Sequence, residues 1–188
     1  MDIATLVIIV LAIALVAVVG WIMYDRRRSE GLKSRFGPEY GRVVEEADDR
    51  RAAESELEAR QRRVDKLDIR PLPQDERDRY AAEWKTVQAQ FVDEPAAAIS
   101  EADRLIGDVM QAQGYPVADF EQRAADVSVD HPGVVEHYRA AHAIAITEAE
   151  PDASTTTEDL RQAMVHYRAL FEDLLGMGKS ERPQQTQA

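Results

Sequence analysis

The start of the chain constrains it most, because residues 3–24 form an apolar run of 22 residues without one charged side chain. A helix of that length rises about 33 Å, slightly more than the hydrocarbon core of a bilayer. Backbone polar groups find no water in lipid, so a spanning segment of this kind must be helical. The sequence therefore predicts an all-α protein with a single N-terminal transmembrane helix, Ile3–Tyr24, within an anchor region 1–24.

A cleaved signal peptide is the alternative for this segment. Such a peptide has a basic start, an apolar core of about 7–15 residues and small residues at the cleavage site that follows. Here Asp2 is the one charged side chain before the run, and Ala12, Ala14 and Ala17 lie inside the run instead of after it. We therefore expect the segment to remain as an anchor.

The basic side chains that follow the run predict its orientation. Residues 26–35 carry five basic side chains and one acid, whereas the N-terminal flank has no Lys or Arg. The positive-inside rule then places the long C-terminal part in the cytoplasm. Arg26, Arg27 and Arg28 form the densest cluster, and each can contribute about 1 kcal/mol by contact with anionic lipid headgroups.

Charge is unevenly distributed along the 188 residues, whose net charge is −12. Residues 26–70 hold 13 basic and 11 acidic side chains, a net of +2, whereas residues 71–175 hold 8 basic and 21 acidic side chains, a net of −13. The acidic part would repel phosphate backbones, so we expect no nucleic-acid partner. The chain has no cysteine, which excludes disulfides, thiolate metal sites and cysteine nucleophiles.

The remainder divides by composition into a basic joint (25–37), a charged helical stalk (38–70), an acidic helical bundle (71–175) and a disordered tail (176–188). Within the stalk, we expect one long and mostly solvated helix from Pro38 to about Lys66. The prolines of the segment 70–73 then end it, since proline lacks a backbone N–H and restricts the preceding residue.

The stalk has only a thin apolar stripe. Val43, Leu57 and Val64 share one heptad position, which Arg50 interrupts. A sustained coiled coil needs apolar residues at both seam positions over several heptads, and about half are present here. We therefore predict a single helix with a weak tendency to form a homo-oligomer.

The acidic part shows helical periodicity throughout. Helices are expected over 74–91, from Pro95 to the Gly114 cap, from the Asp119 cap through Asp126, from the Asp130-His131-Pro132 segment onward, and from Thr156 or Thr157 to about Leu175. The predicted core residues are Tyr80, Trp84, Val87, Phe91, Ile99, Ala102, Leu105, Ile106, Val109, Met110, Val134, Val135, Tyr138, Ala141, Ile144, Leu160, Met164, Tyr167, Phe171 and Leu174.

No residue pattern points to catalysis, a cofactor or a metal. His137 and His142 are five residues apart, whereas spacings of three or four bring two imidazoles to one face of a helix. Asp130 before Pro132 reads as a helix cap in preference to an acid–base pair with His131. Arg123 has no evident partner nearby; it either lines a groove or pairs with an acid of another helix.

Three blocks carry a resemblance to a known family: RFGPEYGRVVEE (35–46), residues 102–144 and TEDLRQAMVHYRALFEDLL (157–175). Together they resemble a family of small, uncharacterised bacterial proteins with an N-terminal apolar segment. The resemblance implies a bacterial cell membrane as the location. It implies no activity, ligand or catalytic residue.

These patterns favour a non-enzymatic, membrane-tethered adaptor or scaffold that presents an acidic domain to a cytoplasmic protein partner. A small-ligand sensor or an enzyme with a pocket between the helices is the first alternative, because helical bundles can host sites that no short motif reveals. A structural protein that self-assembles through residues 38–67 is the second.

Overall fold

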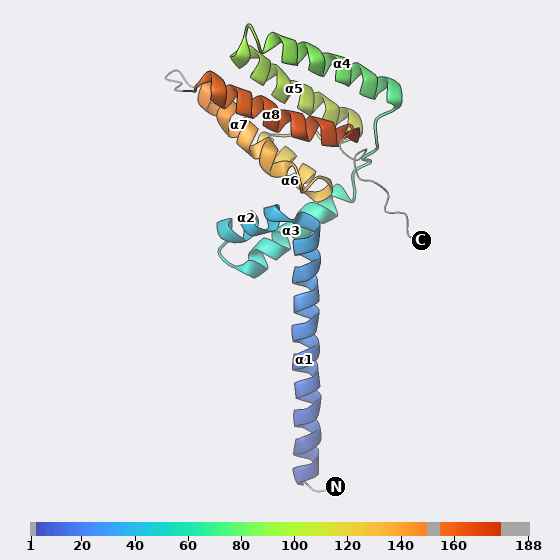
Figure 1. Cartoon of the computed structure of the whole chain (residues 1–188). Helices are drawn as coiled ribbons and strands as arrows, with labels where there is room; N and C mark the ends of the chain where they lie inside the picture. The colour runs from blue at the N-terminus through green and yellow to red at the C-terminus, as the bar shows by residue number, and fades with distance from the viewer. Residues whose placement is uncertain (1–2, 150–154, 178–188) are drawn as a thin grey trace, which may run out of the picture. The chain divides into compact units, whose positions relative to one another are not determined.

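The chain is entirely helical over the part that the structure, a computed structural model, describes. It contains eight helices and no strand there, which confirms the predicted all-α class (Figure 1). The structure leaves undescribed residues 1–2, 150–154 and 178–188, and the side chains of 3–10. Most of the predicted tail therefore lies outside the described residues. The helices are α1 (Ile3–Phe36), α2 (Pro38–Glu46), α3 (Arg50–Val64), α4 (Gln74–Gln90), α5 (Pro95–Gln113), α6 (Phe120–Asp130), α7 (Val135–Glu148) and α8 (Thr157–Leu174).

Among the described residues, no helix is both long and apolar enough to cross a membrane. The predicted span, 3–24, includes residues 3–10, whose side chains are outside the described part. The transmembrane helix stays a prediction.

The chain forms two compact units, residues 1–58 and 59–188. In the first unit, α1 continues without a break to Phe36, so the expected joint over 25–37 is wrong for most of its length. Gly31 lies inside the helix and faces open space, and its neighbours are mostly residues with good helix propensity. The chain turns only at Gly37, which adopts a φ of 51°, and Pro38 then begins α2.

The predicted single helix of the stalk is also wrong, because the chain breaks between α2 and α3. Ala47 takes an extended conformation at the end of α2. The carboxylate of Asp49 accepts a hydrogen bond of 2.8 Å from the backbone N–H of Ala52, which is the geometry of a helix cap. Aspartate side chains bond the backbone locally in this way, and they thereby compete with a continuous helix.

Two of the three residues of the thin apolar stripe, Val43 and Leu57, are buried within the first unit instead of being solvated. The buried apolar residues of the first unit are Leu32, Phe36, Tyr40, Val43, Ala53 and Leu57. Glu54 is buried beside them and accepts hydrogen bonds from the hydroxyls of Ser29 (2.6 Å) and Tyr40 (2.9 Å). Hydrogen bonds of this kind offset the cost of burying a carboxylate. They connect α1, α2 and α3 to one another.

The second unit is a helical bundle built around α5, which packs against α4, α7 and α8 (Figure 1). Helices α7 and α8 lie side by side, and α6 packs on α7. The predicted stripes form most of this core. Of the predicted core residues, all are buried except Phe91, Val134 and Ile144, which are partly buried against it. Thr156 caps α8 in a capping box with Asp159, as one of the two predicted caps.

The segment between α3 and α4 is held tightly against the end of α5. Gly114 adopts a φ of 105°, and a Cβ atom placed there would lie 2.3 Å from the carbonyl oxygen of Asp68. The backbone N–H of Arg70 donates to the carbonyl of Gln113 at 2.9 Å. Glycine is therefore required at position 114 both for its backbone conformation and for the close approach of the segment between α3 and α4.

The beginning of α7 differs from the prediction. Asp130 is the last residue of α6 and accepts a hydrogen bond from the hydroxyl of Tyr115 at 3.1 Å, so it is not the cap of the following helix. Gly133 follows Pro132 in a turn, and α7 begins only at Val135. Helix α6 also extends beyond the predicted end at Asp126 to Asp130, and its added residues include the buried Val127 and Val129.

Candidate functional site

The three arginines predicted to contact lipid headgroups are not equivalent. Arg26 and Arg27 are exposed on α1. Arg28 is half-buried and forms an ion pair with Glu58 of α3. The hydrogen bond that Arg28 donates to Glu58 within this ion pair raises the pKa of Arg28 above its usual value. Two of the three side chains are therefore directed to solvent, and the third connects two helices of the first unit.

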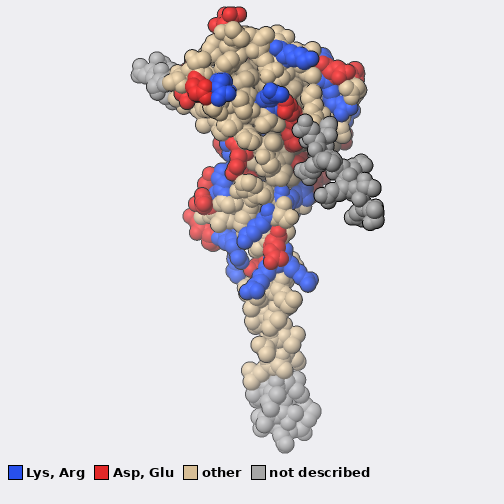
Figure 2. Space-filling model, in the orientation of Figure 1, with Lys and Arg blue, Asp and Glu red and all other residues tan. Residues whose placement is uncertain are grey.

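Two arginines of α3 lie beside the same part of α1. Arg50 forms an ion pair with Asp25 at 2.8 Å, and the guanidinium of Arg51 lies 5.5 Å from the centroid of the Trp21 ring. Figure 2 shows Lys and Arg side chains gathered around α1 where its uncharged stretch ends. We call Arg26, Arg27, Arg50 and Arg51 the arginine collar. The sequence did not reveal its α3 members, because contacts across 25 or more residues leave no local pattern.

Next to the arginine collar, the described apolar side chains of α1 are exposed on every side of the helix. The exposed fraction ranges from 41% for Ile22 to 72% for Val16. Monomers rarely expose contiguous apolar patches larger than a few hundred Å² unless the patch binds a partner or a membrane. The exposed members from position 11 onward are Leu11, Ile13, Leu15, Val16, Val18, Val19, Trp21, Ile22, Met23 and Tyr24.

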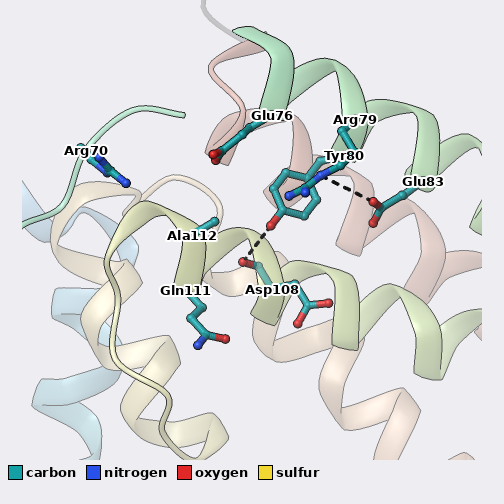
Figure 3. Close-up of a pocket in the computed structure, with 8 residues that line it drawn as sticks. All are labelled: Arg70, Glu76, Arg79, Tyr80, Glu83, Asp108, Gln111 and Ala112. Atoms are coloured by element: carbon teal, nitrogen blue, oxygen red, sulfur yellow. Dashed lines mark hydrogen bonds and ion pairs between the residues drawn. The ribbon is translucent and has the colours of Figure 1, made fainter. Parts of the chain in front are cut away.

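A groove of about 650 Å³ lies on the second unit between α4, α5 and the segment that precedes α4 (Figure 3). The guanidinium of Arg79 lies 4.6 Å from the centroid of the Tyr80 ring and 3.8 Å from the carboxylate of Glu83. The Tyr80 hydroxyl donates to the carbonyl of Asp108 at 3.4 Å. The lining residues are Arg70, Glu76, Arg79, Tyr80, Glu83, Asp108, Gln111 and Ala112.

The lining of this groove decides what it can bind. It contains three carboxylates, two guanidiniums and one tyrosine ring, but no histidine, serine or threonine. Small-molecule pockets are mostly apolar with a few polar groups, whereas this groove is open and mostly charged. Its chemistry therefore suits the charged side chains of another protein better than an acyl- or phosphoryl-transfer reaction.

A second polar cluster draws residues from helices α5 to α8 and centres on Asp103. The hydroxyl of Tyr167 donates to Asp103 at 3.1 Å, and Arg123 lies 3.6 Å from the other carboxylate oxygen. Arg123 thus pairs with an acid of another helix, the second of the two predicted roles. It packs so closely on α5 that a Cβ at Gly107 would lie 2.9 Å from its guanidinium.

His142 completes this cluster. Its ring stacks on Phe120 with centroids 3.5 Å apart, and its Nδ1 lies 3.8 Å from Asp103, too far for a hydrogen bond. Burial lowers the pKa of His142, and the nearby Asp103 offsets part of that effect. Burial likewise raises the pKa of Tyr138, whose hydroxyl has no hydrogen-bond partner among the described residues. The charged side chains of the cluster are mostly buried and lie close to one another, and we assign the cluster a structural role.

Acidification is expected to destabilise the second unit through His142. Because the pKa of this residue is lowered in the folded chain from its ordinary value of 6.5, the unfolded chain binds more protons just below that value. The free energy of unfolding should then be constant above about pH 7 and fall as the pH decreases from 6.5 toward the folded pKa, by about 1.4 kcal/mol for each unit by which the pKa is lowered. Denaturant titrations between pH 5 and 8 in a Trp21→Phe background, followed by Trp84 fluorescence, measure this.

The charged and titratable groups that face His142 are Asp103 of α5, Glu121 and Arg123 of α6, and Tyr138 of α7. Replacing His142 by Gln should flatten the pH dependence, although the other histidines remain. An unchanged slope in this variant would assign the pH dependence to another group.

The structure pairs the remaining histidines across helices. The Nδ1 atom of His131 lies 2.5 Å from the carboxylate of Asp173. His137 and His142 do not meet, whereas His137 of α7 contacts His166 of α8. His166 is partly buried beside the core and makes this hydrogen bond. Sequence spacing could not reveal the second pair, because its members are 29 residues apart.

Comparison of the chain with models of protein families, with curated proteins and with solved structures finds no match. The resemblance to small bacterial proteins with an N-terminal apolar segment therefore stays a prediction.

Proposed function

We propose that this protein is a membrane-tethered helical adaptor of the bacterial cell membrane. The observation that carries the proposal is the exposed apolar surface of α1, which ends at the arginine collar. Burying exposed apolar surface is worth about 25 cal/mol per Å², and lipid is the environment that covers a helix on all sides. The uncharged run 3–24 has the length that such a helix needs.

The arginine collar supports a cytoplasmic location for the rest of the chain. Its four side chains belong to α1 and α3, and Trp21 and Tyr24 adjoin it, as aromatic residues do at the membrane–water interface. Lys and Arg near the end of a span favour the cytoplasmic side. We therefore place Arg26 to the C-terminus in the cytoplasm, with the arginine collar at the level of the lipid headgroups.

The adaptor role rests on the second unit. The region 71–175, with its net charge of −13, is held away from an anionic membrane by repulsion and remains available to a partner. The groove offers Glu76, Glu83 and Asp108 beside two arginines. We infer a protein partner whose contacting surface carries basic and acidic side chains in the complementary arrangement.

Photocrosslinking in cells tests the adaptor role. A photoreactive amino acid at Gln111, which is exposed and lines the groove, should give one adduct of defined mass with a cytoplasmic protein. The same amino acid at Gln162, exposed on α8 away from the groove residues, is the matched control and should not give that adduct. The absence of adducts at Gln111, or the same adducts at both positions, would reject the groove as the docking site.

A further inference from the structure

His137 and His166 meet at the junction of α7 and α8, which pack along one another. Their Nδ1 atoms lie 2.8 Å apart, their ring centroids lie 5.0 Å apart, and the ring planes differ by 27°. The two nitrogens are thus much closer than the ring centroids, so they face one another. Both side chains are partly exposed, so ions in solution can reach them.

This geometry requires that one imidazole donates and the other accepts, because a hydrogen bond between two ring nitrogens holds a single proton. Two neutral imidazoles whose nitrogens converge are also a pair of metal ligands. We propose that His137 and His166 bind one divalent transition-metal ion, Cu²⁺, Ni²⁺ or Zn²⁺, which replaces the shared proton. This site is independent of the membrane anchor and of the groove.

The separation of the two nitrogens suits such an ion, but the rings must turn to bind it. Metal–nitrogen bonds of about 2.0–2.1 Å at angles between square and tetrahedral geometry put two ligand nitrogens about 2.8–3.4 Å apart. The observed separation of 2.8 Å is at the lower end of this range, but the rings lie nearly end to end, so each ring must rotate until its nitrogen points to an ion beside the line that joins the two nitrogens. Imidazole nitrogens suit all three ions, and square geometry favours Cu²⁺ and Ni²⁺.

The site has two protein ligands, and water completes the coordination. Among the described residues, no group of three or more His, Asp or Glu side chains is arranged to hold a metal. Binding in the micromolar range is therefore expected, in contrast to the tight binding of a closed site with four protein ligands. An ion held between α7 and α8 stabilises the folded chain in proportion to its concentration relative to Kd.

Metal titration of the full-length chain tests the proposal. The chain is purified in detergent with an affinity tag that contains no histidine, cleared of metal with a chelator, and titrated with chloride salts of Cu²⁺, Ni²⁺ and Zn²⁺. We expect saturable binding of one ion per chain and a higher Tm. Replacing His137 or His166 by Gln should weaken the affinity about tenfold or more. Replacing His131 by Gln is the matched control and should leave the affinity unchanged.

Electron paramagnetic resonance of the unaltered chain with one equivalent of Cu²⁺ provides a readout that does not depend on how the variants fold. Coupling to two imidazole nitrogens would support the site, and its loss in the His166→Gln variant would locate it. The proposal is overturned if no ion binds saturably, if both Gln variants bind as the unaltered chain does, or if the Cu²⁺ spectrum shows fewer than two nitrogens.

Discussion

Replacing Ile13 and Val16 by Asp is expected to move the protein from the membrane fraction to the soluble fraction. Both side chains are exposed on α1, and both lie near the middle of the uncharged run. Each Asp at the centre of a spanning helix costs about 2.5–3.5 kcal/mol on insertion scales. Two such costs exceed what most single spans tolerate. Alkaline extraction of membranes, with immunoblotting of both fractions, measures the distribution.

A matched pair of substitutions separates this effect from a general increase in solubility. Val92 and Val117 are exposed apolar residues of the second unit, 82% and 80% accessible. Replacing both of them by Asp adds the same charge and should leave the protein in the membrane fraction. If both double variants were extracted equally, or if neither were, the apolar run of α1 would not be the anchor.

Replacing Gly114 by Ala is expected to destabilise the second unit by about 3 kcal/mol or more. A left-handed backbone costs a residue with a Cβ roughly 1–2 kcal/mol, and overpacking adds about 1–3 kcal/mol. Here the added atom would lie 2.3 Å from a backbone oxygen of Asp68, which cannot rotate away as a side chain does. The segment before α4 must then move, and the hydrogen bond between Arg70 and Gln113 is weakened.

Trp84 reports this loss, because its ring stacks on Phe171 in the core of the second unit with centroids 4.6 Å apart. Denaturant titration in a Trp21→Phe background follows this one fluorophore. Gly133→Ala is the control, since position 133 has no left-handed backbone and no atom within 4 Å of the added Cβ; its effect should stay within about 0.5 kcal/mol. A loss no larger than that at Gly114 would contradict the described packing.

The bundle was predictable because its helices carry their own signals. Apolar residues repeat at helical spacing from Tyr80 to Leu174, and Asp119, Thr156 and Gly114 stop or start helices by local chemistry. Such patterns need no knowledge of the partner helix. The predicted core is therefore largely correct.

The first unit was less predictable, because tertiary contacts determine it. The acids at 48–49 look like any charged helical surface until Asp49 is seen to cap α3. Burial of Glu54 depends on hydroxyls 14 and 25 residues away. The strongly charged sequence of the first unit therefore did not predict that it folds.

The residues of the candidate sites were likewise predictable only where a local sequence signal marks them. Arg26 and Arg27 could be identified by their position after the apolar run, but Arg50 and Arg51 join them only through the fold. Similarly, the contact between His137 and His166 depends on the packing of two helices. Long-range pairs of this kind have no signature in a single sequence.

Labelling of single cysteines tests the central proposal, a membrane span with a cytoplasmic helical domain, most directly. The natural chain contains no cysteine, so Asp2→Cys and Gln162→Cys each provide one reactive site without background. In intact cells whose outer envelope is permeabilised, a membrane-impermeant maleimide should label the chain with Asp2→Cys and should label the chain with Gln162→Cys only after lysis. Labelling of Gln162→Cys before lysis, or no labelling of Asp2→Cys before lysis, would contradict the proposed anchor and orientation.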